Sequence, residues 1–334
     1  MPTIQDVAKK AGVAAITASR VVNNSGYASR EVRERVLQAA AELGYVPNTL
    51  ARSLRSRRSD TLALVLTDIT NPFFTTVARG VEDAASDAGY TVIFCNTDES
   101  EDEERKYLNV LLQKRVDGIL LVPARDGLGS LQAAREQNTP LVVLDRRLPA
   151  GAAGDVVRCD SLGGAYALTR LLLGLGHRRL VLLNGPAAVS TAADRAAGFR
   201  QALAEEPGAQ GGMLEGSFTQ ASGAEMARRA LAADPRPTAL IAGNNFIAIG
   251  ALNAARELVL RVPEDTALAG FDDLPPALVT FPFLTVASQP AYAMGQAATR
   301  LLLERLNGAD GAPRELVLPT ELIVRASSGA PLTR

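Results

Sequence analysis

Apolar runs alternate with helical segments along the middle of this chain, and this alternation limits the fold more than any other feature. Mostly apolar runs of four or five residues lie at positions 62–66, 91–94, 118–122 and 141–144. Segments with helical periodicity separate them, at 73–89, 101–114 and 128–137. Parallel strands give continuous apolar runs because helices cover both faces of their sheet. The pattern predicts a doubly wound parallel sheet.

The same pattern begins again after about Asp160. Helices are predicted at 163–174, 194–205, 222–232 and 247–258, and strands at 180–183, 212–215, 239–242 and 267–270. Two such sheets would form a core of two lobes. Because ligands of doubly wound folds bind at the carboxyl ends of the strands, we expect a binding site between the lobes.

The first 46 residues have a different pattern, which predicts a small all-α headpiece. Residues 6–24 read as two short helices, with Gly12 supplying the positive φ of the tight turn between them. Thr3 can cap the first helix with Asp6 as its capping-box partner, and Ser29 can cap a third helix. This is a helix-turn-helix pattern, whose second helix fits the major groove of DNA.

Residues 47–59 are predicted to join the headpiece to the core. Pro47 ends the preceding helical pattern, and Asn48 can cap a short helix over 49–54. That helix is too short to be stable alone, so it needs a second copy of itself or DNA as a partner. A basic linker follows at 55–59. The predicted organisation is therefore a headpiece at 1–46, a hinge helix and linker at 47–59, and a core at 60–334.

Charge is distributed unevenly along the chain. Residues 1–60 hold ten Lys and Arg against five acids, a balance of +5, whereas the remainder holds 25 against 31, a balance of −6. A basic head on an acidic body suits a module that binds a polyanion. Asp6, Lys9 and Lys10 lie where a signal peptide would be apolar, and Cys95 and Cys159 are isolated. We expect reduced thiols, no membrane span and a cytoplasmic location.

Residues 3–59 resemble the headpiece of the LacI–GalR family of bacterial transcription regulators. The resemblance rests on residues 3–8, 11–13, 17–21, 23–24, 33–36, 42–45, 47–48 and 51–54. It implies that the second helix reads base edges and that Leu54, from two paired hinge helices, enters the minor groove of a palindromic operator. The implied DNA-binding residues are Ala15, Ile16, Ser19, Arg20, Asn23, Asn48 and Leu54.

The core resembles the periplasmic-binding-protein-like effector domain of the same family. Segments 68–74, 95–98, 115–119, 175–179, 194–199, 270–273 and 284–286 carry this resemblance. It implies three crossings between the lobes, near 160, 288 and 319. The first lobe would then hold about 60–160 and 288–318, and the second about 161–287 and 319–334.

The resemblance also implies a set of effector-binding residues. These are Phe73, Asp160, Thr191, Arg195, Phe218, Asn244, Asp272 and Gln289. The Arg195 guanidinium could grip hydroxyls or a carboxylate, and Asp272 could accept from two hydroxyls. Alternatively, Arg195 and Asp272 form a plain ion pair, the two phenylalanines belong to the core, and Gln289 lies on the surface.

Three positions depart from the family pattern. Ala14 stands where Ser is usual, so a cap or phosphate contact is expected to be missing, and Ala18 stands where Val is usual. Asn245 stands where the family commonly has Asp. This change removes a carboxylate next to Asn244, and it could alter effector choice or the coupling between the lobes.

Three other classes of protein fit the sequence less well. An enzyme with a histidine-dependent triad must use His177, the only histidine, and the sequence has no G-x-S-x-G, P-loop or metal-ligand spacing. A secreted solute-binding protein needs a signal peptide, and an architectural DNA protein does not need two lobes. The sequence therefore predicts a homodimeric repressor without catalytic residues, metal or cofactor. A small effector, either a sugar derivative or a purine or other metabolite, would control its DNA affinity.

Overall fold

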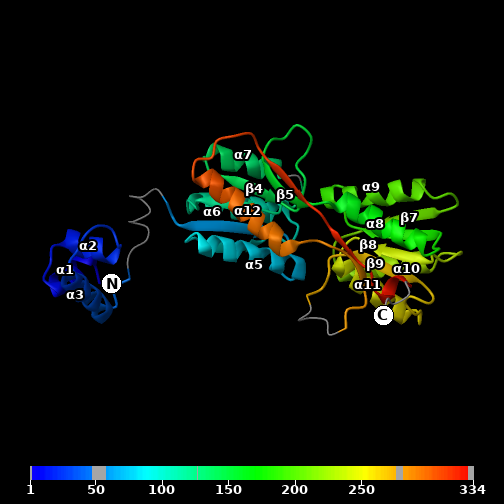
Figure 1. Ribbon diagram of the computed structural model, residues 1–334, viewed down its shortest axis with the longest axis horizontal. Coiled ribbons are helices and arrows are strands. Elements are labelled where there is room, and N and C mark those ends of the chain that lie inside the picture. The colour runs from blue at the N-terminus through cyan, green and yellow to red at the C-terminus, as the bar shows by residue number, and fades with distance from the viewer. Residues whose placement is uncertain (1, 47–57, 126, 276–280, 330–334) are drawn as a thin grey trace. The chain divides into compact units, whose positions relative to one another are not determined.

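The computed structural model of the protein describes residues 2–46, 58–125, 127–275 and 281–329. The chain forms two compact units, Met1–Ser59 and Asp60–Arg334 (Figure 1). No helix among the described residues combines the length and apolarity required to cross a membrane.

The described part of the first unit is built around α1 (Ile4–Ala11), α2 (Ala15–Val22) and α3 (Arg30–Leu43). Buried apolar side chains from all three form its core: Val7, Ala8, Ala11, Ala18, Val21, Val36 and Ala39. The predicted capping box is present, with the Asp6 carboxylate accepting from the Thr3 N–H at 2.8 Å. Gly12, at φ 66°, ends α1 in the left-handed conformation that glycine adopts without strain. The predicted helix-turn-helix is confirmed.

The second unit contains two six-stranded sheets, one in each lobe. In the first lobe the order is β11-β5-β4-β3-β1-β2, and all its pairs are parallel. Its strands are β1 (Thr61–Leu66), β2 (Thr91–Asn96), β3 (Gly118–Leu121), β4 (Leu141–Leu144), β5 (Asp155–Cys159) and β11 (Glu315–Leu318).

The second lobe repeats this order as β12-β10-β9-β8-β6-β7, with β12 antiparallel to β10. Its strands are β6 (Arg179–Asn184), β7 (Gln210–Glu215), β8 (Ala239–Ala242), β9 (Ala267–Phe271), β10 (Thr285–Ser288) and β12 (Glu321–Ile323). The predicted pair of doubly wound sheets is confirmed.

Helices cover both faces of each sheet because the strands are apolar on both faces. On β1, Leu62, Leu64 and Leu66 pack under α5 (Pro72–Asp87) and α12 (Ala291–Leu306). Ala63 and Val65 pack on the other face, under α6 (Glu101–Gln113) and α7 (Leu128–Glu136). In the second lobe the two faces are covered by α8 (Ser161–Gly174) with α9 (Ser190–Ala204), and by α10 (Gln220–Leu231) with α11 (Asn245–Glu257).

Glycines allow paired helices to pack backbone against backbone. A Cβ added at Gly295 of α12 would lie 2.2 Å from the Val77 carbonyl oxygen of α5. In the second lobe, a Cβ at Gly250 of α11 would lie 2.2 Å from the Gln220 carbonyl oxygen of α10. Both distances are far below van der Waals contact, so each helix pair requires glycine at its crossing.

The chain passes between the sheets at three places, after β5, after β10 and after β11. The crossings are short, and two are joined by a hydrogen bond from the Asp160 N–H to the Leu318 oxygen at 2.9 Å. The second and third crossings lie side by side, because residues of both line one surface pocket: Ser288, Pro290, Leu318, Pro319 and Thr320. Figure 1 shows the red C-terminal segment running from the first lobe to the second.

Candidate functional site

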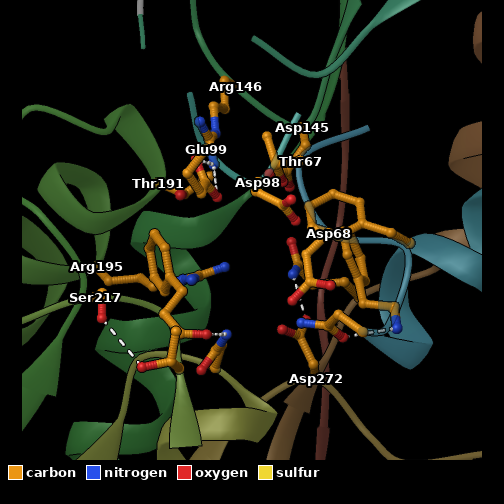
Figure 2. Close-up of a pocket in the computed structure, with 17 residues that line it drawn as sticks. Thr67, Asp68, Asp98, Glu99, Asp145, Arg146, Thr191, Arg195, Ser217 and Asp272 are labelled. Carbon is orange, nitrogen blue, oxygen red and sulfur yellow. Dashed lines mark hydrogen bonds and ion pairs between the residues drawn. The ribbon is translucent and has the colours of Figure 1, made fainter. Parts of the chain in front are cut away.

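A cavity lies between the lobes, where the carboxyl ends of the strands of both sheets meet (Figure 2). Its volume is about 240 Å³. Residues from both lobes line it: Thr67, Asp68, Asn71, Phe73, Phe74, Asp98, Glu99, Asp145, Arg146, Thr191, Arg195, Ser217, Phe218, Thr219, Asn244, Asp272 and Gln289.

Arg195 projects into the cavity from the second turn of α9. The side chain is 3% exposed, and its guanidinium carbon lies 4.2 Å from the centre of the Phe271 ring. One Nη donates to the Gly243 carbonyl oxygen at 2.5 Å, while Nε has no partner among the described residues. Burial lowers the pKa of Arg195, although the carboxylates of Asp272 and Asp145 oppose that shift. The guanidinium therefore has donor capacity left for a ligand.

Asp272 is the first residue after β9, has a positive φ of 67° and lines the cavity. One carboxylate oxygen accepts from Gln289 Nε2 at 2.5 Å, and Gln289 Oε1 has no partner in the described parts of the chain. Burial raises the pKa of Asp272 to about 6, against the lowering effects of Arg195 and Gln289. A ligand that donates hydrogen bonds would satisfy this pair.

Asn244 and Phe218 form the adjoining part of the wall. Asn244 is the N-cap of α11: its Oδ1 accepts from the Ile247 N–H at 2.8 Å, and its Nδ2 donates to the Phe218 oxygen at 3.4 Å. The Phe218 ring lies against Gly185, where an added Cβ would come within 2.1 Å of the ring. Gly185 therefore makes room for an aromatic face beside polar groups, as in sites that bind ligands with both kinds of surface.

The first lobe contributes an acidic wall. Asp68, Asp98, Glu99 and Asp145 line it, each placed shortly after a strand end. Arg146 is 2% exposed and binds both oxygens of Glu99, at 2.6 and 2.7 Å, as Figure 2 shows. Its Nη1 also donates to the carbonyl oxygens of Pro123 and Ala124.

Asp145 is the most buried carboxylate of this wall, at 7% exposed. Its Oδ1 accepts no hydrogen bond from the described residues. Burial raises the pKa of Asp145, while Arg146 and Arg195 lower it. Like the Asp272–Gln289 pair, Asp145 is suited to a ligand that donates hydrogen bonds.

In the first unit, α2 presents Ala15, Ile16 and Arg20 as exposed side chains, and Ile16 is 62% exposed. Ser19 and Asn23 are half-buried, and Asn23 Nδ2 donates to the Ser19 carbonyl oxygen at 2.8 Å. An apolar residue beside an arginine on an exposed helix can meet a thymine methyl and a guanine edge.

Comparison with known proteins places both units. Residues 3–48 match the sequence model of bacterial regulatory proteins of the lacI family. Residues 59–326 match the model of periplasmic binding proteins and the sugar binding domain of the LacI family. The chain belongs to the LacI family.

Two curated relatives extend along nearly the whole chain. The ribose operon repressor of Halalkalibacterium halodurans is 38% identical over 98% of this chain and 97% of its own length. The HTH-type transcriptional repressor PurR of Photobacterium profundum is 33% identical over 98% of each chain.

Two solved structures are also similar to this chain. A complex of the transcriptional regulator CelR with cellobiose has a TM-score of 0.73 at 34% identity, covering 98% of this chain and all of that one. The lac repressor dimer bound to operator and the anti-inducer ONPF has a TM-score of 0.86 at 27% identity, covering 98% of this chain and 99% of that one.

Seven of the eight effector residues implied by the LacI-family resemblance line the cavity: Phe73, Thr191, Arg195, Phe218, Asn244, Asp272 and Gln289. The eighth, Asp160, is not in the lining. It is the N-cap of α8, and its carboxylate accepts from the Gly163 N–H at 2.8 Å. Helix capping accounts for this carboxylate without a ligand.

The first-lobe acids and Arg146 were not among the sequence-derived candidates. The sequence does indicate them by position: each follows a predicted strand and therefore lies at the carboxyl edge of a parallel sheet, where ligands bind. No group of three or more His, Cys, Asp or Glu in the described part of the chain is arranged to hold a metal ion.

Two of the DNA-binding candidates, Asn48 and Leu54, lie outside the described residues. Ala14, the departure noted from the sequence, is the N-cap of α2 and provides no side-chain hydrogen bond. The helix that carries Ile16 and Arg20 therefore begins without the cap that a serine could supply.

Proposed function

We propose that this chain is a homodimeric transcription repressor whose operator affinity is set by a small neutral sugar bound between the lobes of its core. The observation that carries the proposal is the cavity itself, which takes polar groups from both lobes and places Phe218 beside them. A ligand that contacts both lobes can favour one arrangement of the lobes over another, and such a differential contact is the requirement for control at a distance.

The chemistry of the wall favours a neutral ligand with many hydroxyl groups. Among the described residues, five carboxylates line the cavity against two guanidiniums, and Arg146 is already paired with Glu99. Carboxylates accept hydrogen bonds from hydroxyls but repel phosphates. A volume of about 240 Å³ lies below the range of about 300–1,000 Å³ typical of larger ligands, which favours a monosaccharide.

The DNA-binding proposal rests on α2 together with the family. Its exposed Ala15, Ile16 and Arg20 are suited to base edges, with Ser19 and Asn23 beside them. A dimer would place two such helices on a palindromic site, and the lac repressor dimer is a relative described with its operator. We further propose that Leu54 inserts between base steps at the centre of this site.

We also propose that the protein catalyses no reaction and acts in the cytoplasm, where the operator is. The relatives named above are repressors and regulators, which supports a regulatory role.

A thermal-shift screen of the full chain tests the effector proposal. Ribose, hexoses and their phosphates, nucleosides and purines are compared, because a ligand that binds only the folded state raises the unfolding temperature. We expect a neutral sugar to give the shift and Arg195→Ala to remove it. A shift with sugar phosphates alone would contradict the charge argument.

Operator binding is tested with DNA fragments selected by the full chain from a random pool. Leu54→Ala should weaken binding to the selected site at least tenfold while leaving the sugar-induced thermal shift unchanged. Arg20→Ala should lower affinity about 10- to 100-fold and relax the preference at one base pair. Unchanged operator affinity in Leu54→Ala would rule out the minor-groove role.

A purine is the second candidate effector. PurR is among the relatives, and three aromatic rings, Phe73, Phe74 and Phe218, line the cavity. A purine base could stack on such a ring while its nitrogens bind the amides and carboxylates. The nucleosides and purines in the thermal-shift screen separate this candidate from the sugar.

A further inference from the structure

Contacts at two places join the lobes beside the cavity, one at Asn71 and Asn245 and the other at Asp194, which Arg147 and Arg158 both approach, Arg158 Nη1 at 4.0 Å. Asn245, the first residue of α11 in the second lobe, donates from Nδ2 to Asn71 Oδ1 in the first lobe at 2.9 Å. Elsewhere, the Arg147 N–H donates to Ser190 Oγ at 2.8 Å, and the Arg147 guanidinium lies 2.8 Å from the Asp194 carboxylate. The two contacts differ in burial and in charge.

The orientation of the Asn71 amide is fixed by the helix that it caps. Asn71 is the N-cap of α5, and its Oδ1 accepts from the Phe73 N–H at 3.0 Å. The same oxygen faces Asn245, so residue 245 must donate. Turning the Asn71 amide over would offer its NH₂ group to Asn245 but would leave the Phe73 N–H without this cap.

The Asn71–Asn245 contact is buried, with Asn245 only 1% exposed and Asn71 only 5% exposed. Asn245 Oδ1 has no partner among the described residues. Forming the contact therefore gains one hydrogen bond and leaves one acceptor unsatisfied, and these effects oppose each other. The balance between joined and separated lobes is accordingly close at this contact.

The Arg147–Asp194 contact is of another kind. The Arg147 side chain is 44% exposed, so water and salt screen its attraction to Asp194. An exposed ion pair tolerates small movements of either partner, whereas the buried amide pair depends on the position of one shared oxygen. The amide pair is therefore the contact more sensitive to lobe spacing.

We infer that Asn245 is a positioning residue: its amide holds the lobes at the spacing that completes the cavity, without itself contacting the ligand. Asn245 is absent from the cavity lining, while its neighbour Asn244 and its partner Asn71 both line it. The inference deepens the proposed function, because the lobe spacing regulates the same effector site.

In the Asn71–Asn245 contact, Asn245 is the donor and Asn71 is the acceptor. The same substitution, asparagine to aspartate, should therefore have different effects at the two positions. In Asn245→Asp, an ionised carboxylate cannot donate and instead faces the Asn71 oxygen. In Asn71→Asp, a carboxylate can still accept from both the Phe73 N–H and Asn245 Nδ2. Each substitution puts an acid at a helix N-terminus, where the helix dipole favours it, so both variants should fold.

The experiment measures the distance between the lobes in the free full-length protein by pulsed electron spin resonance. Labels are attached at Thr75→Cys on α5 and Ala221→Cys on α10, which are both exposed. Cys95 and Cys159 are buried, and burial raises the pKa of both thiols, so labelling favours the introduced cysteines. Excess unlabelled protein suppresses distances between subunits.

We expect Asn245→Asp to reduce the population at the wild-type distance about tenfold, because its carboxylate loses the bridging hydrogen bond and faces the Asn71 oxygen. Asn71→Asp should retain the wild-type distance, and Asn253→Asp, at an exposed position of α11, should behave likewise. A wild-type distribution in Asn245→Asp, or equal opening in Asn71→Asp, would overturn the inference. Neither DNA nor effector is present, so this result is independent of the effector screen.

Discussion

The two lobes have the same strand order but present different chemistry to the cavity. β4 and β9 occupy equivalent places in their sheets, and each is followed by an aspartate at positive φ, 64° at Asp145 and 67° at Asp272. Each aspartate donates its backbone N–H to the next strand, to Val157 at 2.9 Å and to Ala287 at 3.2 Å. Both side chains are buried, and burial raises the pKa of both.

The difference lies in what accompanies the two aspartates. Beyond β2 the first lobe places Asp98 and Glu99, whereas beyond the equivalent β7 the second lobe places Ser217, Phe218 and Thr219. At this pair of equivalent strand ends, the first lobe thus presents carboxylates and the second lobe presents hydroxyl groups and an aromatic ring. The strand ends therefore set where ligand-binding side chains can lie, and the loop residues that follow each strand set which ligand groups those side chains can bind.

The largest expected effect tests whether the equivalent aspartates contribute equally. We expect Asp272→Ala to weaken binding of the sugar identified in the screen at least about 100-fold, because two charged hydrogen bonds are each worth about 1.5–3 kcal/mol. Asp145→Ala should have a similar effect if the lobes grip the ligand alike. Isothermal titration calorimetry measures both.

Asp160→Ala is the control for this pair, since Asp160 caps a helix outside the cavity lining. It should lower the unfolding temperature without changing affinity. A full effect in Asp272→Ala with none in Asp145→Ala would show that the second lobe alone selects the ligand.

The next effect tests whether the lobes pack by the same rule. Gly295→Ala in the first lobe and Gly250→Ala in the second should each lower the free energy of unfolding by about 1–3 kcal/mol, because the added methyl meets backbone atoms that cannot move aside. Gly174→Ala, at the end of α8 with no atom within 4 Å of the new Cβ, should be neutral or stabilising. Urea unfolding measures all three, and equal stability of the four proteins would contradict the packing argument.

The smallest effect concerns pH. Hydroxyl donors bind the ionised form of Asp272 more strongly, so affinity for a neutral sugar should rise through a pH of about 6 and be about tenfold weaker at pH 5. The stability of the free protein has the opposite sign, because a carboxyl whose folded-state pKa is raised favours folding most when it is protonated, below pH 4. Asp272→Asn should flatten both dependences, and a steep profile in that variant would assign the titration to another group.

Most of the fold could be predicted because buried parallel strands leave continuous apolar runs. The strands not anticipated individually were β5, β10, β11 and β12. β11 is exposed at Glu315 and through most of its length, and β12 is a three-residue edge strand, so neither has a distinct apolar pattern. Chain-distant pairing, such as Leu316 beside Val157, leaves no local signal in either segment.

The second-lobe side of the candidate site was predicted better than the first-lobe side. Arg195, Asp272 and Gln289 were named through the family resemblance, and they do lie together in the cavity. The Arg146–Glu99 pair was missed because a charged residue in a loop ordinarily reads as solvated surface. The Arg146 guanidinium is buried only in the folded chain, where it contacts Glu99, 47 positions away in the sequence.

The three crossings between the lobes restrict how the core can move. Because the crossings are short and neighbouring ones are linked, they resist sliding of one lobe along the other and leave rotation about a common hinge line as the easy motion. The core then resembles a mechanism with one degree of freedom. Any ligand that binds in the cavity would then act on the same single quantity, the angle between the two lobes, whatever its chemical identity.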